Sequence, residues 1–384
     1  MALDRKRPED FLELVERAKR GRLKVYIGPA AGVGKTYQML EEAHALKKRG
    51  VDVVMAFIET HGRAETEALV EGLEVIPRRR MEYRGVTVEE MDLDAVLKRH
   101  PQVAVVDELA HTNIPGSRNR KRYQDVFELL EAGINVICAF NVQHLESLND
   151  LVKQATDVVV RETIPDSFLK QADQVVNLDL AVEDLIERLR AGKIYSQEKV
   201  AWALEHFFKP EKLSMLREIA LREVAESIDR TVSAQAHSDE NSHRAVASER
   251  VMVCLNPHTA RAATLLRRGS RLAGRLNTDW FVVYVETLKE NALRIDAEAQ
   301  RRLIDTEQKA RELGAEVVRL NAKDPVPALL EFARAHRVGH IVIDRTNKPW
   351  WRQILGQSVM LRLVKQAAGF DLYIVSFEEE GESA

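Results

Sequence analysis

Residues 23–36 read LKVYIGPAAGVGKT. The apolar run 23–27 predicts a buried strand, the glycines predict a turn, and residues 37–48 predict a helix. Strand, glycine loop and helix in this order form a phosphate-binding loop when main-chain N–H groups and the helix N-terminus surround an anion. In such a loop Lys35 would neutralise the β- and γ-phosphates and Thr36 would bind Mg²⁺. The stretch therefore predicts a nucleotide-binding α/β domain.

The glycine spacing departs from the strict phosphate-loop pattern. Four residues should separate the first glycine from Gly34, which would put a glycine where Pro29 stands, whereas five follow Gly28. Gly32 gives the variant spacing G-x-G-K-T. An ordinary glycine turn before a helix is the alternative, and we favour phosphate binding because a strand and a helix flank the loop. The loop residues expected to bind nucleotide are Gly28, Gly32, Val33, Gly34, Lys35 and Thr36.

An acidic pair supplies the second half of the expected site. The apolar run 103–106 ends in Asp107 and Glu108. The aspartate would hold Mg²⁺ with Thr36, and the glutamate could polarise an attacking water as a catalytic base. Alternatively, the two acids cap a helix at the end of a strand. Their place downstream of the glycine loop favours the magnesium site.

Other strand ends carry polar residues at the same edge of the sheet. The run 51–58 leads into ETHGR (59–63), which fits a nucleotide-sensing loop and a plain strand-to-helix connection equally well. The run 134–140 leads to Gln143, which could orient a water or sense a γ-phosphate. The basic loop 118–122 could place an arginine against a phosphate, or be a solvated turn.

Composition sets the class of protein. The 384 residues are 45% hydrophobic and 30% charged with net charge −3, which is enough chain for two domains and gives no reason to expect nucleic acid. Cys138 and Cys254 lie in apolar runs and are expected to be reduced core thiols. No apolar run is long enough to span a membrane, and the charged residues 1–22 do not form a secretory signal. We expect a cytoplasmic protein.

The alternation of strands and helices predicts the domain organisation. We expect an N-terminal helix over 1–20, a P-loop NTPase-like parallel-sheet domain over 21–230 that ends in a helical hairpin, and a small-residue linker over 231–249. Short runs at 158–160 and 174–178 predict two further strands of the first sheet. Five strands and four helices over 250–378 predict a flavodoxin-like or universal-stress-type α/β domain, followed by a tail over 379–384.

Residues 24–229 resemble the N-terminal cytoplasmic region of KdpD-type osmosensitive potassium sensor histidine kinases, and residues 250–378 resemble the universal stress domain that follows it there. The segments that carry the resemblance are GPAAGVGKT (28–36), ETHGR (59–63), VVDELAHTN (105–113), NVQHLESLND (141–150), RETIPD (161–166) and FFKPEKLSMLREIALR (207–222). Family members continue into membrane helices and a kinase core, whose motifs we do not find in this sequence. Autophosphorylation is therefore not expected of this chain, and weak ATP hydrolysis stays open.

The resemblance implies that the first domain binds ATP as a regulator, with the glycine loop and Asp107 on the family's nucleotide motifs. It also implies a sensor kinase or response regulator of the potassium-uptake system as partner, which would bring the chain to the inner membrane. Some family members bind cyclic di-AMP in the stress domain, where this sequence has Pro257, Thr259 and the aromatic run 280–284. The wider family's ATP loop is incomplete here, since Gly356 remains but the earlier glycines do not, and Gln357 separates it from Ser358.

The leading hypothesis is a cytoplasmic nucleotide-binding sensory module of a KdpD-type two-component system, acting in potassium or osmotic signalling. A different class is the alternative: a P-loop ATPase or small-molecule phosphotransferase with Glu108 as base and an arginine from 118–122. A structural adaptor without nucleotide affinity is the third. The cluster Trp350, Trp351 and Arg352 could meet a partner or simply pack.

Overall fold

The computed structural model describes residues 19–83, 85–236, 250–256, 259, 261–276, 278–287, 297–344 and 359–376. These residues form two compact units, the first within 19–227 and the second mainly from 228 onwards. Each unit contains its own parallel sheet, which confirms the predicted α/β class. The expected N-terminal helix (except its last residues), the residues 350–352 and the tail lie outside the described residues, as does most of the expected linker.

The first unit is built on a six-stranded parallel sheet in the order β3-β2-β6-β7-β1-β8. Its strands are β1 (Leu23–Gly28), β2 (Val53–Phe57), β3 (Glu74–Val75), β6 (Val103–Val106), β7 (Asn135–Asn141) and β8 (Gln174–Asn177). Parallel strands end at one edge of the sheet, so the segments that follow β6, β7 and β1 are neighbours. This order brings the glycine loop and the acidic pair together.

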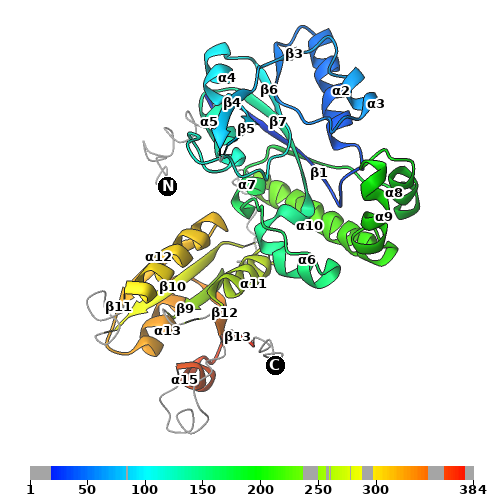
Figure 1. Cartoon of the computed structure of the whole chain (residues 1–384). Helices are drawn as coiled ribbons and strands as arrows, with labels where there is room; N and C mark the ends of the chain where they lie inside the picture. The colour runs from blue at the N-terminus through cyan, green and yellow to red at the C-terminus, as the bar shows by residue number, and fades with distance from the viewer. Residues whose placement is uncertain are drawn as a thin grey trace. The chain divides into compact units, whose positions relative to one another are not determined.

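Helices lie on both sides of this sheet, with α2 opposite α4 and α5 in Figure 1. Alternate strand residues explain the arrangement: Tyr26, Met55 and Val105 pack with Met39 and Leu40 of α2 in one core cluster. The helices are α2 (Lys35–Lys48), α3 (Ala64–Ala68), α4 (Leu93–Arg99), α5 (Arg122–Glu131), α6 (Asn149–Thr156), α7 (Asp166–Lys170), α8 (Val182–Arg190), α9 (Gln197–His206) and α10 (Pro210–Ala236), with 3₁₀ turns at Val142–His144 and Glu146–Leu148.

Three details differ from the sequence expectations. Residues 158–160 do not form a strand, because β8 pairs directly with β1 and the side chains of Val158 and Val159 are exposed. An antiparallel hairpin, β4 (Arg79–Tyr83) and β5 (Val86–Glu90), was not anticipated, since half of its strand residues are charged and most are solvent-exposed. Helix α10 continues to Ala236, into the stretch expected to be a linker.

The second unit has a five-stranded parallel sheet in the order β11-β10-β9-β12-β13. Its elements are β9 (Arg250–Leu255), α11 (Ala262–Arg275), β10 (Trp280–Glu286), α12 (Ala297–Glu312), β11 (Glu316–Asn321), α13 (Pro325–Ala335), β12 (Val338–Asp344), α15 (Val359–Gln366) and β13 (Asp371–Val375). Separate core clusters cover the two faces of the sheet, so that alternate residues of β10, such as Trp280 and Phe281, lie in different clusters. The unit is therefore doubly wound, with helices on both faces.

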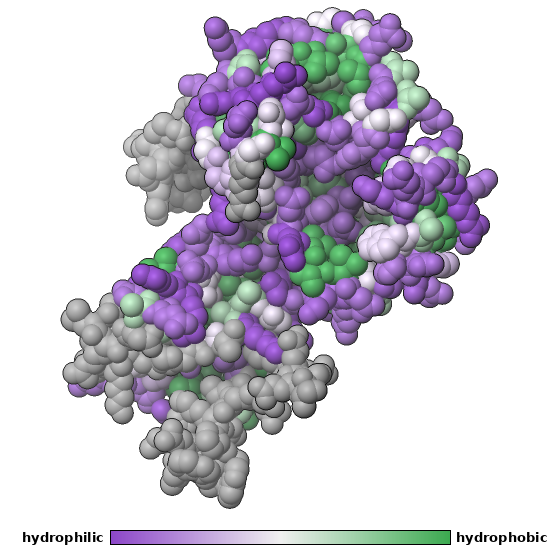
Figure 2. Space-filling view, in the orientation of Figure 1, coloured by the Kyte–Doolittle hydropathy of each residue, from purple (hydrophilic) through white to green (hydrophobic). Residues whose placement is uncertain are grey.

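The surface and the buried thiols follow the composition. Hydrophilic residues predominate on the face shown in Figure 2. None of the described helices combines the length and the apolar character that crossing a bilayer requires. Cys138 in β7 and Cys254 in β9 are both buried and free, as predicted. Burial raises the pKa of the Cys254 thiol to about 12, which keeps it an inert core residue at neutral pH.

Gly269 allows helix α11 to lie close against the second sheet. A Cβ at this position would lie 2.3 Å from Val253 Cγ2 and 3.2 Å from Trp280 Cζ3. We expect Gly269→Ala to lower the free energy of unfolding by about 1–3 kcal/mol, because overpacking outweighs the better helix propensity of alanine. Denaturant unfolding checks this, with Arg268→Ala on the exposed side of the same helix as control. Equal midpoints for the two variants would contradict the packing argument.

Candidate functional site

The loop between β1 and α2 needs glycine at particular positions. Gly32 and Gly34 have φ of 93° and 96°, a region that residues with a Cβ rarely adopt. A Cβ on Gly32 would lie 2.2 Å from Ile194 Cδ1, and one on Gly28 would lie 2.7 Å from Val33 Cγ2. Gly34 is the N-cap of α2, so the helix begins at Lys35. The loop therefore curls tightly and leaves the helix N-terminus at the sheet edge, where free N–H groups favour an anion.

The Lys35 ammonium is held by neutral oxygens. Lys35 Nζ donates to the carbonyl oxygen of Ala30 at 3.0 Å and makes a very short hydrogen bond to Oδ1 of Asn141. Asn141 is the last residue of β7 and pairs with Gly28 in the register of the sheet, which explains its place. Burial lowers the pKa of Lys35 to about 8, although the charges of Asp107 and Glu108 oppose the shift. At neutral pH this ammonium is mostly charged and has no direct ion pair with a described residue.

Thr36 and Asp107 lie in contact beside the lysine. Thr36 Oγ1 donates to Asp107 Oδ2 at 2.8 Å, and the Glu108 amide donates to Asp107 Oδ1 at 2.9 Å. Burial, then the neighbouring Glu108, raises the pKa of Asp107 to about 6. A hydroxyl and a carboxylate are the hard oxygen donors that Mg²⁺ prefers, and a cation here would relieve the cost of burying the carboxylate. The two residues therefore fit a magnesium ion.

These groups line one cavity of about 440 Å³, a volume within the usual range of small-molecule sites. Among the residues predicted from the sequence, the cavity brings together Gly32, Gly34, Lys35, Thr36, Asp107 and Glu108. The other lining residues come from the segment after β2, from the end of α8 and from the α8–α9 connection. They include His61, Arg63, Arg188, Lys193 and Tyr195. Four cationic side chains in this lining suit a multiply charged anion.

The segment 59–63 reaches the acidic pair. His61 Nε2 lies 3.3 Å from Glu108 Oε1, and both side chains are about half exposed. The hydrogen bond lowers the pKa of Glu108 and raises that of His61. Thr60 hydrogen-bonds Glu67, and Glu59 pairs with Arg78 at 3.2 Å. The segment therefore lines the cavity with His61 and Arg63. Both interpretations, a nucleotide-sensing loop and a plain strand-to-helix connection, stay predictions.

Some of the expected site residues lie elsewhere. Gly28 and Val33 pack against each other under the loop, outside the cavity lining. Gln143 lines a separate apolar pocket of about 550 Å³ with Trp202 and Phe208, and its Oε1 is buried without a hydrogen-bond partner. The lysine instead contacts Asn141, two residues earlier.

Of the arginines proposed to reach a phosphate, the two with described contacts are engaged elsewhere. Arg118 forms ion pairs with Asp94 and Glu128. Arg122 is 1% exposed, pairs with Glu90 at 3.2 Å, and stacks 3.7 Å from the centroid of the Phe57 ring. Neither lines the cavity.

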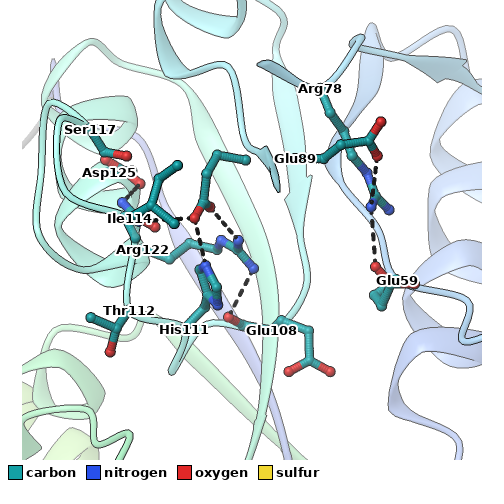
Figure 3. A network of polar contacts seen from close by, with 12 residues as sticks. Glu59, Arg78, Glu89, Glu108, His111, Thr112, Ile114, Ser117, Arg122 and Asp125 are labelled. Carbon is teal, nitrogen blue, oxygen red and sulfur yellow. Dashed lines mark hydrogen bonds and ion pairs between the residues drawn. The ribbon is translucent and has the colours of Figure 1, made fainter. Parts of the chain in front are cut away.

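Arg122 supports the backbone of the acidic pair. Its guanidinium donates to the carbonyl oxygens of Glu108 at 3.2 Å and of Asp107 at 3.5 Å, while the Glu108 carboxylate points away from it (Figure 3). Glu108 has φ of 51°, a conformation that costs a non-glycine residue on the order of 1–3 kcal/mol. The buried arginine therefore holds a strained backbone that directs the two carboxylates.

Glu90 is the acceptor at the centre of this network. Its carboxylate accepts from the ring of His111 at 2.9 Å and from the Ile114 amide at 3.1 Å, besides Arg122. Burial would raise its pKa, but the His111 hydrogen bond, together with Ile114 and Arg122, holds that pKa below its ordinary value. The β4–β5 hairpin thus fixes the segment that follows β6.

Sequence reasoning missed Asn141 and the lining from the α8–α9 connection. Asn141 could have been predicted as a site residue, because it is the polar residue at the end of a buried strand. Residues 188–196 carried none, since they read as an ordinary helix end and loop.

Comparison with known proteins identifies relatives over most of the chain. A family described as KdpD, the osmosensitive K⁺ channel His kinase sensor domain, matches residues 19–228. The Sensor protein KdpD of Escherichia coli strain K12 is 42% identical over 97% of this chain and 41% of its own length. The Putative sensor protein KdpD of a Synechocystis species is 43% identical over 93% of this chain and 95% of its own. The chain thus spans less than half of the first relative and nearly all of the second.

Solved structures of universal stress proteins resemble about a third of the chain. One from Archaeoglobus fulgidus, in complex with dAMP, is 21% identical and covers 33% of this chain and 96% of its own, with a TM-score of 0.26. Another, in complex with cAMP, is 18% identical and covers 34% and 98%, with a TM-score of 0.28.

We expect Glu90→Gln to destabilise the first unit by about 3–5 kcal/mol, because it leaves the Arg122 charge buried without a compensating carboxylate. Glu89→Gln is the matched control, since Glu89 is 41% exposed and its pairs are solvated. Denaturant unfolding at neutral pH measures both. The folded pKa of Glu90 is lowered, so its contribution is present at neutral pH and fades as the pH falls through that folded value. Indistinguishable midpoints for the two variants would refute this role.

Proposed function

The chain belongs to the KdpD family of osmosensitive K⁺ channel His kinase sensor domains, and on that premise we propose that it binds ATP with Mg²⁺ at the β1–α2 loop. In this proposal the first unit is a sensory module of a two-component system for potassium or osmotic stress. Nucleotide occupancy would be passed on by protein contacts, with a sensor kinase or response regulator as partner.

The observation that carries the proposal is the state of Lys35. Its buried ammonium has two neutral carbonyl acceptors and sits in the same cavity as the Thr36–Asp107 pair. A buried cation normally requires a counter-charge, and a polyphosphate at the helix N-terminus would supply one. The arrangement is therefore poised for an anionic ligand.

Each group has a distinct role toward such a ligand. Lys35 would exchange its carbonyl partners for β- and γ-phosphate oxygens, and the N–H groups at the start of α2 would bind the phosphate chain. Thr36 and Asp107 would hold Mg²⁺, and phosphate oxygens and water would be its other ligands. The bound ion would neutralise phosphate charge. Asn141 would keep the lysine at the sheet edge until the ligand arrives.

Replacing the lysine tests the proposal. We expect Lys35→Ala to weaken Mg-ATP binding roughly 10- to 100-fold, because a charge-assisted contact to phosphate is lost. Calorimetric titration of the full chain measures this. Lys24→Ala is the matched control, since Lys24 lies on β1, the strand before the loop, but pairs with Glu42 at 2.8 Å, outside the cavity. Equal affinity in wild type and Lys35→Ala would remove the site, and no affinity in the wild type would favour a structural adaptor.

Hydrolysis is a second candidate, because Glu108 presents a half-exposed carboxylate with a lowered pKa to the same cavity. An ionised glutamate at that place could act as general base toward water. In the structure, however, His61 holds this carboxylate. Binding without turnover fits that contact better.

The two candidates differ in turnover. If the chain is a binding module, wild type and Glu108→Gln will both release phosphate at the background rate. If Glu108 is a catalytic base, wild type will turn over and Glu108→Gln will lose roughly 100-fold or more. Phosphate release under excess Mg-ATP measures the difference, with Lys35→Ala as the blank. Turnover that depends on Glu108 would reject the regulatory proposal in favour of an ATPase or phosphotransferase.

The second unit offers less support for a ligand. Of the residues considered for cyclic di-AMP, Thr259 donates to Asp344 at 2.9 Å, while Trp280 and Tyr284 are both 1% exposed within the core. Pro257 lies outside the described residues. A cyclic dinucleotide in this unit stays a prediction.

A further inference from the structure

Arg63 occupies an unusual position in the cavity. It is the N-cap of α3 and projects its guanidinium into the lining shared by Lys35 and Asp107. Its Nη2 donates a hydrogen bond to the carbonyl oxygen of Ile194 at 2.9 Å. Its Nε is buried and has no hydrogen-bond partner. A buried guanidinium N–H without an acceptor is costly, so this group has unused capacity to bind.

The charges around Arg63 also favour an anion. The Arg63 charge lowers the pKa of Lys35, and the Arg188 charge lowers that of Arg63, so the three cations lie near one another. Burial lowers the pKa of Arg63, while Asp107 and Glu108 partly offset this. Lys193 already pairs with Glu65 at 2.9 Å. Arg63 therefore stands beside the expected magnesium site, and no carboxylate among the described residues forms an ion pair with it.

The partner of Arg63 connects the cavity to the loop between α8 and α9. Ile194 is 3% exposed and packs its side chain against Gly32 of the phosphate loop, while its carbonyl accepts from Arg63. The next residue, Tyr195, lines the cavity and packs edge-to-face against Phe208, with 5.8 Å between ring centroids. Phe208 lies two residues before the start of α10. Ile194 thus contacts Arg63 through its carbonyl and the phosphate loop through its side chain.

We propose that Arg63 binds the terminal phosphate of a nucleoside triphosphate and gives up the Ile194 carbonyl as it does so. This inference rests on the proposed nucleotide site. The loop that carries Arg63 follows β2, which lies beyond β6 when the strands are counted from β1. Arg63 therefore approaches from the far side of Asp107, which would place it at the phosphate farthest from the nucleoside if Lys35 and the start of α2 hold the rest of the phosphate chain.

Two consequences follow from this exchange of partners. A diphosphate lacks the group that Arg63 binds, so the site distinguishes triphosphate from diphosphate through one guanidinium. Release of the Ile194 carbonyl loosens residues 192–196, and this change is the signal that reaches α9 and α10. A ligand can shift such an equilibrium only by its differential contact with the two states, and the terminal phosphate supplies that contact.

The test compares Mg-ATP with Mg-ADP on the full chain. For wild type we expect tighter binding of ATP. In Arg63→Ala we expect ATP affinity to fall roughly tenfold, with ADP affinity changed less than about twofold. Arg63→Lys should keep part of the preference, since it keeps the charge but loses the guanidinium geometry. Arg78→Ala is the matched control: Arg78 also donates to a loop carbonyl, that of Ile58, but does not line the cavity, so the preference should survive.

Hydrogen exchange measures whether the hydrogen bond between Arg63 and the Ile194 carbonyl is released. Amides of 192–196 should exchange faster in wild type with Mg-ATP than with Mg-ADP, and in Arg63→Ala they should exchange fast with either. Equal losses of ATP and ADP affinity in Arg63→Ala, an unchanged preference, or exchange that ignores the nucleotide would each overturn the inference. If wild type binds while Lys35→Ala does not, and the preference survives without Arg63, only this inference fails. If wild type binds neither nucleotide, the proposed function fails with it.

Discussion

The burial of one ammonium group without a carboxylate partner is the constraint on which the first unit depends. Lys35 can be placed there because β7 lies next to β1 and ends in Asn141, and because the glycine loop returns the Ala30 carbonyl to the same nitrogen. Neutral oxygens accept two hydrogen bonds from the ammonium while leaving its charge uncompensated. The strand order, the left-handed glycines and the first turn of α2 all serve this placement.

Different residues at the carboxyl edge of the first sheet fix the backbone and form the proposed binding site. The Arg122–Glu90 pair is buried, and a buried ion pair is weak evidence for stability because desolvation offsets the attraction. The role of the pair is positional: Arg122 binds the carbonyls of Asp107 and Glu108, and the second of these residues has a strained backbone. The carboxylates themselves stay directed into the cavity, where Asp107 keeps a raised pKa and responds to any cation. The Arg122–Glu90 pair thus fixes the backbone of Asp107 and Glu108 and leaves their carboxylate charges available to the cavity.

The sequence predicted the parts of this site that local chemistry defines. Buried strands, the glycine loop and the acids after β6 can be predicted from apolar runs and the residues that end them. Lys35, Thr36 and Asp107, which the sequence proposes as part of a nucleotide site, line one cavity. The β4–β5 hairpin was missed because half of its strand residues are charged and most are exposed, so its strands lack the apolar alternation that marks a half-buried sheet. The lining from 188–196 depends on tertiary packing against Gly32, which no local pattern encodes. Asn141 rather than Gln143 reaches the lysine because strand register, and not loop composition, decides which polar residue lies there.

A site can be assembled for binding and still be poorly arranged for turnover. Here the one carboxylate that could activate water shares a hydrogen bond with His61 at 3.3 Å, and the acidic pair's backbone is fixed by a residue outside the cavity. Efficient catalysis needs groups arranged for the transition state, whereas these contacts stabilise the resting chain. In contrast, Lys35 and Arg63 contact neutral carbonyl oxygens, which a triphosphate could displace at low cost. That asymmetry is what a reversible nucleotide sensor requires, because its response depends on differences in binding free energy.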